Sequence, residues 1–354
     1  MSNIDIIFFS SSEFTLPILE NIVHSQGSDI IALAQRQLDE SSHFLSLPEL
    51  NLINTAFKEF ADTNQSLDAV KVVTQPDRTH RSKPQSNPIT TWARRNNLDL
   101  FQPERIRASI DEYSSFIQSP NETIAIVASY GQILPEGILD AHTYGCINWH
   151  PSLLPLYRGP TPMQSLLNQG DANTGLTWIE MEKGMDSGPI LLQTHHTIKP
   201  EDTFTNLKNS MGKHGVDTWA IALVMQLMSR QGSVIRSIQQ DHSAATFTPM
   251  LSKNDRRIDP KQSRAEDIIN RYRGYLEFPG ISFYSSFFGA ELRLDGIGFE
   301  AKTSVGQVVY EDPELIWNSQ SETLLRTKDG CVHLKKVTNL SSGKQINMRG
   351  FSFI

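Results

Sequence analysis

Two polar residues, Asn148 and His150, stand at the end of a short apolar run in the stretch CINWHPSLLPLYRGP, residues 146–160. An amide beside an imidazole can stabilise negative charge that develops on an oxygen, as acyl transfer requires. Because side chains alternate along a strand, both would point to one side and Trp149 to the other. Prolines then fix the path of the chain, at Pro151, Pro155, Pro160 and Pro162. Taken alone, the pair is explained equally well by polar groups that satisfy the backbone at a strand end.

A carboxylate follows in the turn MEKGMDSGPI, residues 181–190. Gly184 and Gly188 allow the backbone to fold tightly, so Asp186 can reach back toward the end of the sheet. Asparagine, histidine and aspartate that converge on one place form an acid–base and electrostatic constellation of the kind used in acyl transfer. The alternative is that Asp186 only caps its own loop, as most turn aspartates do.

These three positions need a scaffold, and the first 200 residues alternate strand-like and helix-like runs. Short apolar runs predict parallel strands at 4–9, 69–74, 122–129 and 145–150. Helices are predicted at 88–98, after residue 162 and at 203–229, and an edge hairpin at 175–182 and 189–198. This alternation predicts an α/β fold with a doubly wound, mostly parallel, Rossmann-like sheet. Ligands bind beyond the carboxyl ends of such strands, which is where residues 145–150 end.

The C-terminal part of the chain does not continue this alternation of strands and helices. After a polar, proline-bearing connection, one helix is predicted at 263–275. Short β runs with Gly and Asn/Asp turns then follow at 281–288, 290–299, 306–311, 322–327 and 331–337. Such a series predicts a small, OB-like β-barrel. We therefore expect a catalytic domain at 1–230 with an insertion at about 27–68, a linker at 231–250 and a C-terminal barrel domain at 251–354; residues 47–62 could form an amphipathic helix in the insertion.

The composition excludes several classes of protein. With 354 residues, 38% hydrophobic and 20% charged, the chain is typical of a folded globular protein. No apolar run approaches the roughly 20 residues that cross a bilayer, and the start shows no basic region or cleavage signal. The two cysteines exclude a disulfide framework and a zinc cage of thiols, which favours the cytoplasm. The charge of −7 is uneven, because 15 of 32 basic but 13 of 39 acidic residues lie from Ala245 onward.

Longer stretches of the sequence resemble the motifs of a known family. CINWHPSLLPLYRGPTPMQ, followed by GDANTGLTWIEMEKGMDSGPIL, resembles the signature of the folate-dependent formyltransferases. Within that family, VVTQPDR, LFQPERI and SYGQILP, together with ATFTPMLSKNDRRID, FPG and TKDGCVHLKKV near the C-terminus, are similar to the branch that acts on methionyl-tRNA. The resemblance covers most of the chain except about residues 27–68.

The resemblance implies transfer of a formyl group from 10-formyltetrahydrofolate to the α-amine of methionine on initiator tRNA, in translation initiation. Asn148 and His150 would stabilise the oxyanion, and Asp186 would orient His150 and assist proton movement. No metal is implied. The residues that would hold the folate are Ser129, Tyr130, Gly131, Gln132, Ile133, Leu134, Pro135, Ser152, Leu153, Leu154, Pro155, Glu182, Gly184 and Met185.

The resemblance also implies that basic residues bind the tRNA, in a protein that we expect to be a monomer. They are Arg78, Arg81 and Lys83 in a loop, and Lys253, Arg256, Arg257, Arg271, Arg273, Lys335, Lys336 and Lys344 in the C-terminal domain. The loop is shorter than in the family and lacks its glycines, and FFSSSEF has serines where the family has a Gly-Thr-Pro turn. Phosphate contacts of this kind add affinity without reading sequence. Solvated surface charges are the alternative.

Four other functions are alternatives. The same chemistry could act on a small amine such as an amino sugar or glycinamide ribotide, or hydrolyse formyl-folate, but neither reaction needs a C-terminal module. A dehydrogenase would require a G-x-G-x-x-G motif after the first strand, which is missing. An RNA-binding protein with an inactive catalytic domain would not need all three polar residues. The sequence leaves the oligomeric state, the rate-limiting step and the role of residues 27–68 undetermined.

Overall fold

The computed structural model of the chain describes residues 3–45, 50–51, 53–55, 57, 65–80, 83–232, 237–304, 307–318, 320 and 322–348. The chain divides into two compact units. The first unit consists of Met1–Pro160, Thr174–His196 and Lys208–Phe247, and the second of Thr161–Asn173, Thr197–Leu207 and Thr248–Ile354. Each unit is thus assembled from separate stretches of chain. The predicted domain boundaries at residues 230 and 250 remain a proposal.

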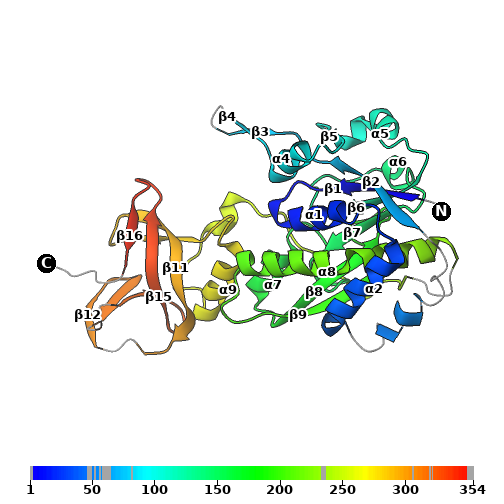
Figure 1. Cartoon of the computed structure of the whole chain (residues 1–354). Coiled ribbons are helices and arrows are strands. Elements are labelled where there is room, and N and C mark those ends of the chain that lie inside the picture. Colours follow the sequence, from blue (N-terminus) through cyan, green and yellow to red (C-terminus); the bar gives the residue numbers. More distant parts are fainter. Residues whose placement is uncertain are drawn as a thin grey trace. The chain divides into compact units, whose positions relative to one another are not determined.

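A seven-stranded sheet forms the centre of the first unit, with the strand order β5-β2-β1-β6-β7-β8-β9 (Figure 1). Its strands are β1 (Asn3–Phe9), β2 (Ser66–Val73), β5 (Leu100–Phe101), β6 (Glu122–Val127), β7 (Cys146–His150), β8 (Asn173–Glu180) and β9 (Ile190–Thr197). The pairs β1–β2, β1–β6, β2–β5 and β6–β7 are parallel, and β7–β8 is antiparallel. The four predicted parallel strands are confirmed, and the predicted hairpin strands β8 and β9 lie at the edge.

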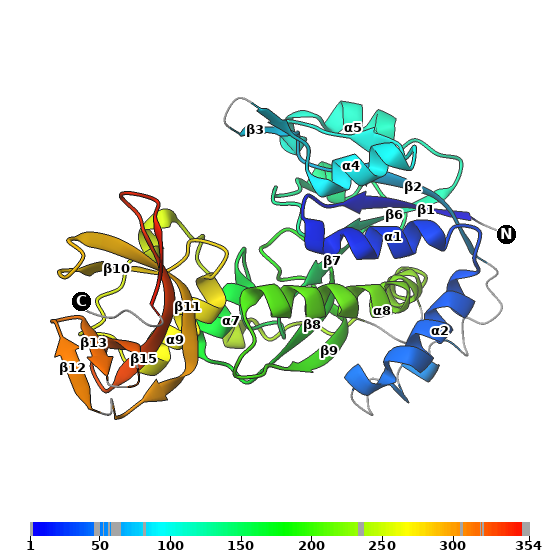
Figure 2. The same cartoon turned by 60° about the vertical axis from the view of Figure 1, so that its left-hand side comes forward.

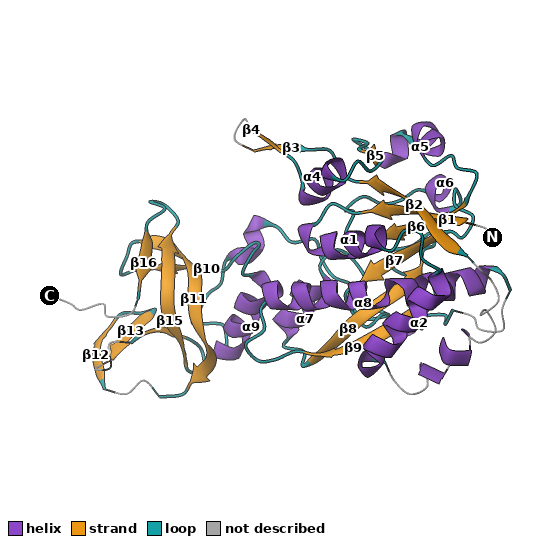
Figure 3. Cartoon of the chain, in the orientation of Figure 1, coloured by secondary structure: helices purple, strands orange, loops and turns teal. Residues whose placement is uncertain are grey.

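Helices cover both faces of this sheet (Figure 3). They are α1 (Leu16–His24), α2 (Ile30–Ser41), α4 (Pro88–Arg95), α5 (Ile110–Phe116), α6 (Glu136–Leu139) and α8 (Phe204–Arg230), with short 3-10 helices η1 (Glu13–Thr15), η2 (Ser42–Phe44), η3 (Ile106–Ala108) and η4 (His242–Ala244). The predicted helices at 88–98 and 203–229 are confirmed as α4 and α8. Within the described residues, no helix has the length and apolar character needed to cross a membrane.

The two faces explain where the polar residues of β7 lie. Gly215 of α8 approaches Trp149 so closely that a Cβ would lie 2.7 Å from the indole Nε1, which places Trp149 under α8. On the other face, Cys146 packs in one cluster with Tyr113 of α5 and Ile138 of α6. Because alternate residues of a strand share a face, Asn148 follows Cys146 onto the α5–α6 side, away from α8. The doubly wound arrangement predicted from the sequence is therefore confirmed.

Part of the expected insertion is a helix that docks on the long helix. Asp29 caps the start of α2 by accepting the Ala32 N–H at 2.8 Å. Gln37 of α2 donates to the Val216 carbonyl at 2.8 Å and accepts the Ala220 N–H at 2.9 Å. Of the amphipathic helix expected at 47–62, the described residues 50–51, 53–55 and 57 are helical, and the others lie outside the described residues.

The second unit holds a curled antiparallel sheet (Figure 2). Its strand order is β10-β11-β15-β14-β13-β12, and β16 pairs with β15. Its strands are β10 (Ser282–Ser285), β11 (Ala290–Lys302), β12 (Val308–Glu311), β13 (Leu315–Asn318), β14 (Thr323–Arg326), β15 (Cys331–Asn339) and β16 (Gln345–Asn347). This agrees with the expected small barrel. The sequence did not predict β13, whose four residues are all buried and show no alternation, or β16, which has only three residues.

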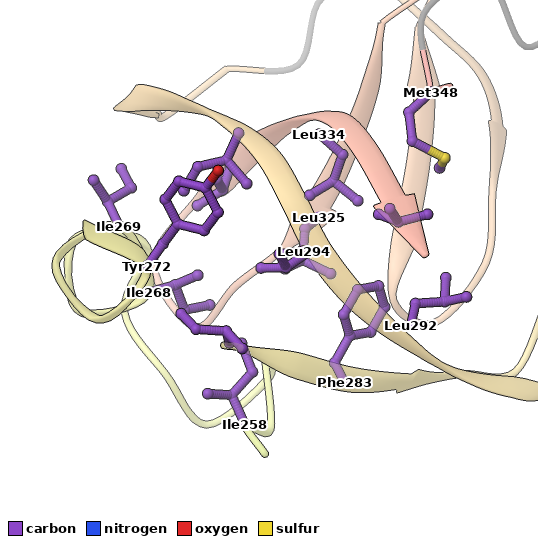
Figure 4. Packing of buried hydrophobic residues seen from close by; sticks show 14 of the residues in the cluster. Ile258, Ile268, Ile269, Tyr272, Phe283, Leu292, Leu294, Leu325, Leu334 and Met348 are labelled. Carbon is purple, nitrogen blue, oxygen red and sulfur yellow. The ribbon is translucent and has the colours of Figure 1, made fainter. Parts of the chain in front are cut away.

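Helices α7 (Pro162–Gln169), η5 (Lys253–Arg256) and α9 (Ala265–Tyr275) complete the second unit. The predicted helices after residue 162 and at 263–275 are confirmed as α7 and α9. Ile268, Ile269 and Tyr272 of α9 pack into the sheet core beside Phe283 and Leu294 (Figure 4). On another side, α9 packs against α7, where a Cβ on Gly274 would lie 2.6 Å from the Gln164 carbonyl oxygen.

Candidate active site

The three residues predicted to carry the chemistry lie together at the carboxyl end of β7. The Asn148 amide donates to Oδ1 of Asp186 at 3.3 Å. Nδ1 of His150 lies 3.6 Å from Oδ2 of the same carboxylate. Oδ2 also accepts the backbone N–H of Gly159 at 2.8 Å. One carboxylate therefore faces both polar residues of the strand and the segment that follows the strand.

The contacts of His150 define which nitrogen carries the proton. Nε2 lies 3.0 Å from the carbonyl oxygen of Tyr157. A carbonyl oxygen only accepts, so Nε2 must be the donor and carry a hydrogen. In the neutral imidazole, Nδ1 is then the unprotonated nitrogen, and it faces the Asp186 carboxylate. Only 4% of His150 is exposed, so the protein and not bulk water orients the ring.

Asn148 has one amide hydrogen that its bond to Asp186 does not use. Its amide nitrogen carries two hydrogens, and the bond to Asp186 uses one of them. The residue is 9% exposed, so a hydrogen bond made there is less weakened by competition with water than at the surface. The second hydrogen is therefore the group in this site that can serve an oxygen on which negative charge develops.

The turn that carries Asp186 depends on its glycines, as the sequence indicated. Asp186 has φ +49°, a left-handed conformation that aspartate tolerates better than most residues. Gly184 has φ +155°, and a Cβ on Gly188 would lie 1.8 Å from the carbonyl oxygen of Glu180. Only glycine fits at position 188 without moving the end of β8. The carboxylate is thus directed by a backbone path that these two glycines permit.

The residues after β7 form a rim that is fixed to β8. Ser152 Oγ donates to the Leu156 carbonyl at 2.7 Å, and Thr177 Oγ1 donates to the Ser152 carbonyl at 2.6 Å. Leu154 N–H donates to Thr177 Oγ1 at 3.2 Å. Of the residues predicted to bind folate in this segment, Ser152 and Leu154 are buried. Their buried side chains therefore support the rim and do not face solvent.

The segment 129–135 contributes an exposed apolar side chain on a rigid backbone. Gly131 has φ +81°, and a Cβ there would lie 2.6 Å from Nε2 of Gln75, which donates to the Tyr130 carbonyl at 2.8 Å. Tyr130 and Leu134 are buried in the α5–α6 core. Ile133, in contrast, is 77% exposed. A large apolar side chain held in solvent by a fixed backbone is suited to contact an apolar ligand.

A second exposed apolar side chain lies on the Asp186 turn, where Met185 is 53% exposed. The turn is joined to the residues after segment 129–135 by an ion pair, since Lys183 Nζ lies 3.0 Å from Oε1 of Glu136. The two predicted folate segments are therefore neighbours. Among the described residues, we find no group of three or more His, Cys, Asp or Glu side chains placed to hold a metal ion.

Comparisons with known proteins show the family to which the chain belongs. The formyl transferase family model matches residues 44–225, so the match begins inside the segment that the sequence motifs left uncovered. The methionyl-tRNA formyltransferase of Thermotoga maritima is 34% identical over 275 residues, covering 76% of this chain and 82% of the relative. The chain belongs to the methionyl-tRNA formyltransferase family.

Solved structures agree with the fold of this formyltransferase family member. WlaRD, a sugar 3N-formyl transferase solved with dTDP and 5-N-formyl-THF, superposes with a TM-score of 0.52 at 15% identity, covering 96% of this chain and 98% of that one. HypX from Aquifex aeolicus in complex with tetrahydrofolic acid gives a TM-score of 0.52 at 12% identity. That match covers 97% of this chain, which spans about half of HypX, 46% of its length.

The basic residues predicted to bind tRNA are spread over both units of the formyltransferase. In the first unit, Arg78 and Lys83 belong to a two-stranded hairpin of β3 (Arg78–His80) and β4 (Lys83–Gln85), and Arg81 lies outside the described residues. In the second unit, three of the predicted cations are exposed: Lys253 on η5, Arg257 directly after η5, and Lys336 on β15. Arg256 and Lys335 are half-buried, and Arg256 lies 3.8 Å from Glu291.

Two arginines of the second unit serve its own packing. Arg273 is 6% exposed and donates to the carbonyls of Asp202 at 2.8 Å and Lys199 at 2.9 Å. Burial lowers the pKa of its guanidinium. Arg271 donates to the Asp255 carbonyl and lies over the ring of Tyr275. These contacts give both arginines a structural role in the formyltransferase, and the burial of Arg273 leaves little of its side chain for a phosphate.

Sequence reasoning missed two residues beside the site, Arg158 and Gln240. Arg158 stands within the proline-rich stretch after β7, directly before Gly159, but its residue type alone indicated no role there. Gln240 falls in the segment taken as a linker. Both are buried, and Arg158 Nη2 donates to Gln240 Oε1 at 2.6 Å. No local pattern signals such a contact, because 82 residues separate the two positions.

Proposed function

We propose that this protein transfers a formyl group from 10-formyltetrahydrofolate to the α-amino group of methionine on initiator methionyl-tRNA. The observation that carries the proposal is the Asp186 carboxylate, which contacts the Asn148 amide and lies 3.6 Å from Nδ1 of His150 in a chain of this family. An amide donor can stabilise charge on the formyl oxygen, and a base beside a carboxylate can take the proton that the amine releases. No observation favours a second reaction.

The described residues fit a folate beside this site. Ile133 and Met185 offer exposed apolar side chains to a flat heterocycle, and the ion pair of Lys183 with Glu136 joins the segments that carry them. When bound, the folate supplies the formyl group. The rim residues Leu153 and Pro155 and the polar side chain of Glu182 would complete the contacts that we propose.

Asn148 would stabilise the charge that develops on the formyl oxygen. Its second amide hydrogen is the donor, and the bond to Asp186 fixes the direction of the amide. Nε2–H of His150 is already used by the Tyr157 carbonyl, so this geometry favours the oxyanion role for Asn148 rather than for both residues.

His150 and Asp186 would move the proton that the attacking amine releases. Nδ1 is the nitrogen that can accept it, because Nε2 already carries a hydrogen. An imidazolium formed in this way lies beside the Asp186 carboxylate, which stabilises the positive charge. Asp186 would therefore stabilise the charged form of the ring, while the hydrogen bond to the Tyr157 carbonyl orients the neutral form.

The tRNA contacts are a further part of the proposal. The exposed cations of the second unit would meet phosphates of the tRNA outside its acceptor end, and the β3–β4 hairpin with Arg78, Arg81 and Lys83 would meet the acceptor end itself. We also propose that the protein acts as a monomer in the cytoplasm. Both cysteines, Cys146 and Cys331, are buried free thiols, which suits a reducing compartment.

An acid-gel formylation assay tests the proposal directly. Purified protein is incubated with 10-formyltetrahydrofolate and with either initiator or elongator methionyl-tRNA. We expect rapid formylation of the initiator alone. Formylation of neither tRNA by a protein that still binds folate would overturn the proposal in favour of a small-amine substrate or of formyl-folate hydrolysis.

A further inference from the structure

Residues 237–247, which we call the bridging segment, join the two loops that form the site. At one end, Ile238 and Ile190 exchange backbone hydrogen bonds of 2.7 and 2.8 Å, just after the Asp186 turn. At the other end, the Arg158 N–H donates to the Thr246 carbonyl at 2.8 Å and the Tyr157 N–H to Thr246 Oγ1 at 2.7 Å. The bridging segment is therefore bonded to the first residue of β9 and to Tyr157 and Arg158. The Tyr157 carbonyl contacts His150, and Arg158 directly precedes Gly159, whose N–H contacts Asp186.

Gln240 makes the side-chain contacts at the middle of the bridging segment. Its Nε2 donates to the carbonyl of Asp186 at 2.9 Å and to that of Gly188 at 2.7 Å. Both amide hydrogens are therefore used on the backbone of one turn. The side chain is 5% exposed, so water does not compete effectively for these carbonyls.

Arg158 fixes which way the Gln240 amide points. Its Nε and Nη2 donate to Gln240 Oε1 at 3.1 and 2.6 Å, and Nη2 also lies 3.1 Å from Nδ1 of His242. A guanidinium has donors only, so the oxygen of the amide must face Arg158 and its nitrogen must face the turn. Arg158 is buried like Gln240, and the two side chains make one connected polar network.

We propose that Gln240 is a positioning residue for the reaction: it holds the backbone of the Asp186 turn so that the carboxylate stays on Asn148 and His150, with Arg158 orienting the Gln240 amide. The proposal rests on the proposed function. Asp186 depends on such support, because it has φ +49° in a turn whose other residues from Glu182 to Met185 are exposed. Gln240 touches no reacting atom and acts through Asp186.

The test uses a variant that keeps the shape of the side chain. Gln240→Glu is expected to preserve both Arg158 contacts as an ion pair, while a carboxylate oxygen replaces the two N–H donors and repels the carbonyls of Asp186 and Gly188. Gln239→Ala is the matched control, because Gln239 is the same residue type one position away and is exposed. Melting temperature and circular dichroism establish that each variant is folded.

We expect Gln240→Glu to lower kcat by about tenfold to a hundredfold, since misplacing a reacting group by about 1 Å has effects of that size. KM for the folate and for the tRNA should change less than about threefold, and Gln239→Ala should match the parent enzyme. In an Asp186→Asn background, the same substitution should cost much less than in the parent, because the residue through which it acts is already altered. Equal losses in both backgrounds, or equal loss of kcat and of the folded fraction, would overturn the positioning role.

A measurement without substrate separates this proposal from the proposed function. The imidazole ¹⁵N shifts of His150, assigned with His150→Gln, report the position of the Asp186 carboxylate. We expect them to move in Gln240→Glu and in Gln240→Ala but not in Gln239→Ala. Unchanged His150 shifts in folded Gln240→Glu would refute the positioning role, whereas a parent protein that formylates no tRNA would refute only the proposed function.

Discussion

Asp186 accepts the backbone N–H of Gly159 through Oδ2 at 2.8 Å, so the carboxylate that faces His150 also ties the turn after β8 to the segment after β7. The two residues are 27 positions apart. Because Gly159 contributes only its backbone, this hydrogen bond depends on the path of the chain from Pro151 to Pro160. The prolines that follow His150 thus serve to hold a hydrogen-bond donor in place.

His150→Ala and Asp186→Ala should each lower kcat by at least about 10², because proton transfer and its electrostatic support are lost. Neither residue is expected to contribute to tRNA affinity, so the Kd for initiator tRNA should stay within about twofold. Single-turnover formylation and filter binding measure the two quantities. Retained turnover in either folded variant would contradict the proposed roles.

Asn148→Ala should lower kcat by about 10² to 10³, the usual effect of removing one oxyanion donor. KM for the folate should change little, since the missing bond forms mainly as charge develops on the formyl oxygen. Steady-state kinetics with each substrate varied in turn distinguish the two parameters. A variant whose KM rises while kcat is unchanged would assign Asn148 to ground-state binding instead.

The double substitution of Lys253 and Lys336 by Glu should weaken tRNA binding about equally for initiator and elongator tRNA, because phosphate contacts do not read sequence. The dependence of affinity on salt should become shallower, by about one unit of slope for each phosphate that the variant no longer neutralises. Filter binding at two salt concentrations measures this. Lys213→Glu, an exposed cation of α8 that pairs with Asp217, is the matched control in the first unit.

Gly188→Ala should reduce both stability and activity. Its Cβ would lie 1.8 Å from the Glu180 carbonyl oxygen, so β8 or the Asp186 turn must move, and overpacking of this kind costs about 1–3 kcal/mol. Gly137→Ala is the control, since its Cβ would meet only Ile110 at 3.5 Å. Chemical denaturation of both variants gives the comparison. Equal stability of the two would show that the turn adjusts freely.

Stability should fall below neutral pH because of His142. Burial lowers the pKa of this histidine to about 4, and its Nε2 lies 2.6 Å from the Tyr113 hydroxyl oxygen. The unfolded chain takes up the proton near pH 6.5 and the folded chain only near pH 4, so stability is complete above pH 7 and is lost as the pH falls toward 4. Between pH 7.5 and 5, His142 alone should remove about 2 kcal/mol.

Chemical denaturation of the parent and of His142→Gln at pH 7.5 and 5 tests this expectation. The parent should lose more of its free energy of unfolding than the variant does. His214, whose pKa burial lowers to about 3, adds a dependence of the same sign in both proteins. An identical pH dependence of parent and variant would show that His142 is not responsible.

The sequence predicted the scaffold well because the signals are local. The apolar runs of β1, β2, β6 and β7 record burial on both faces of a parallel sheet, and they were found within a few residues of their true ends. The helix α8 was predicted to within one residue at each end. β13 was missed because its four residues are all buried and show no alternation, and β16 because it has only three residues.

The candidate site was predicted in its residue types but not in its connections. Asn148, His150 and Asp186 could be named from their spacing and from the motifs around them. Their division of labour could not, because it depends on the Tyr157 carbonyl that holds Nε2 of His150. Both Lys336 and Arg273 were predicted to bind tRNA. Residue type alone could not show that Lys336 is exposed whereas Arg273 is buried.

By itself, the sequence determined which polar residues stand at the end of β7 and which glycines allow the Asp186 turn. It also contained the motifs by which the chain resembles its family. Only the tertiary structure shows that Gln240, from the segment expected to be a linker, donates a hydrogen bond to the Asp186 carbonyl. Gln240 and Arg158 meet across 82 residues, and a contact at that separation arises from how the sheet edge and its loops pack together. Periodicity and turn chemistry act over a few residues, so they carry no information about it.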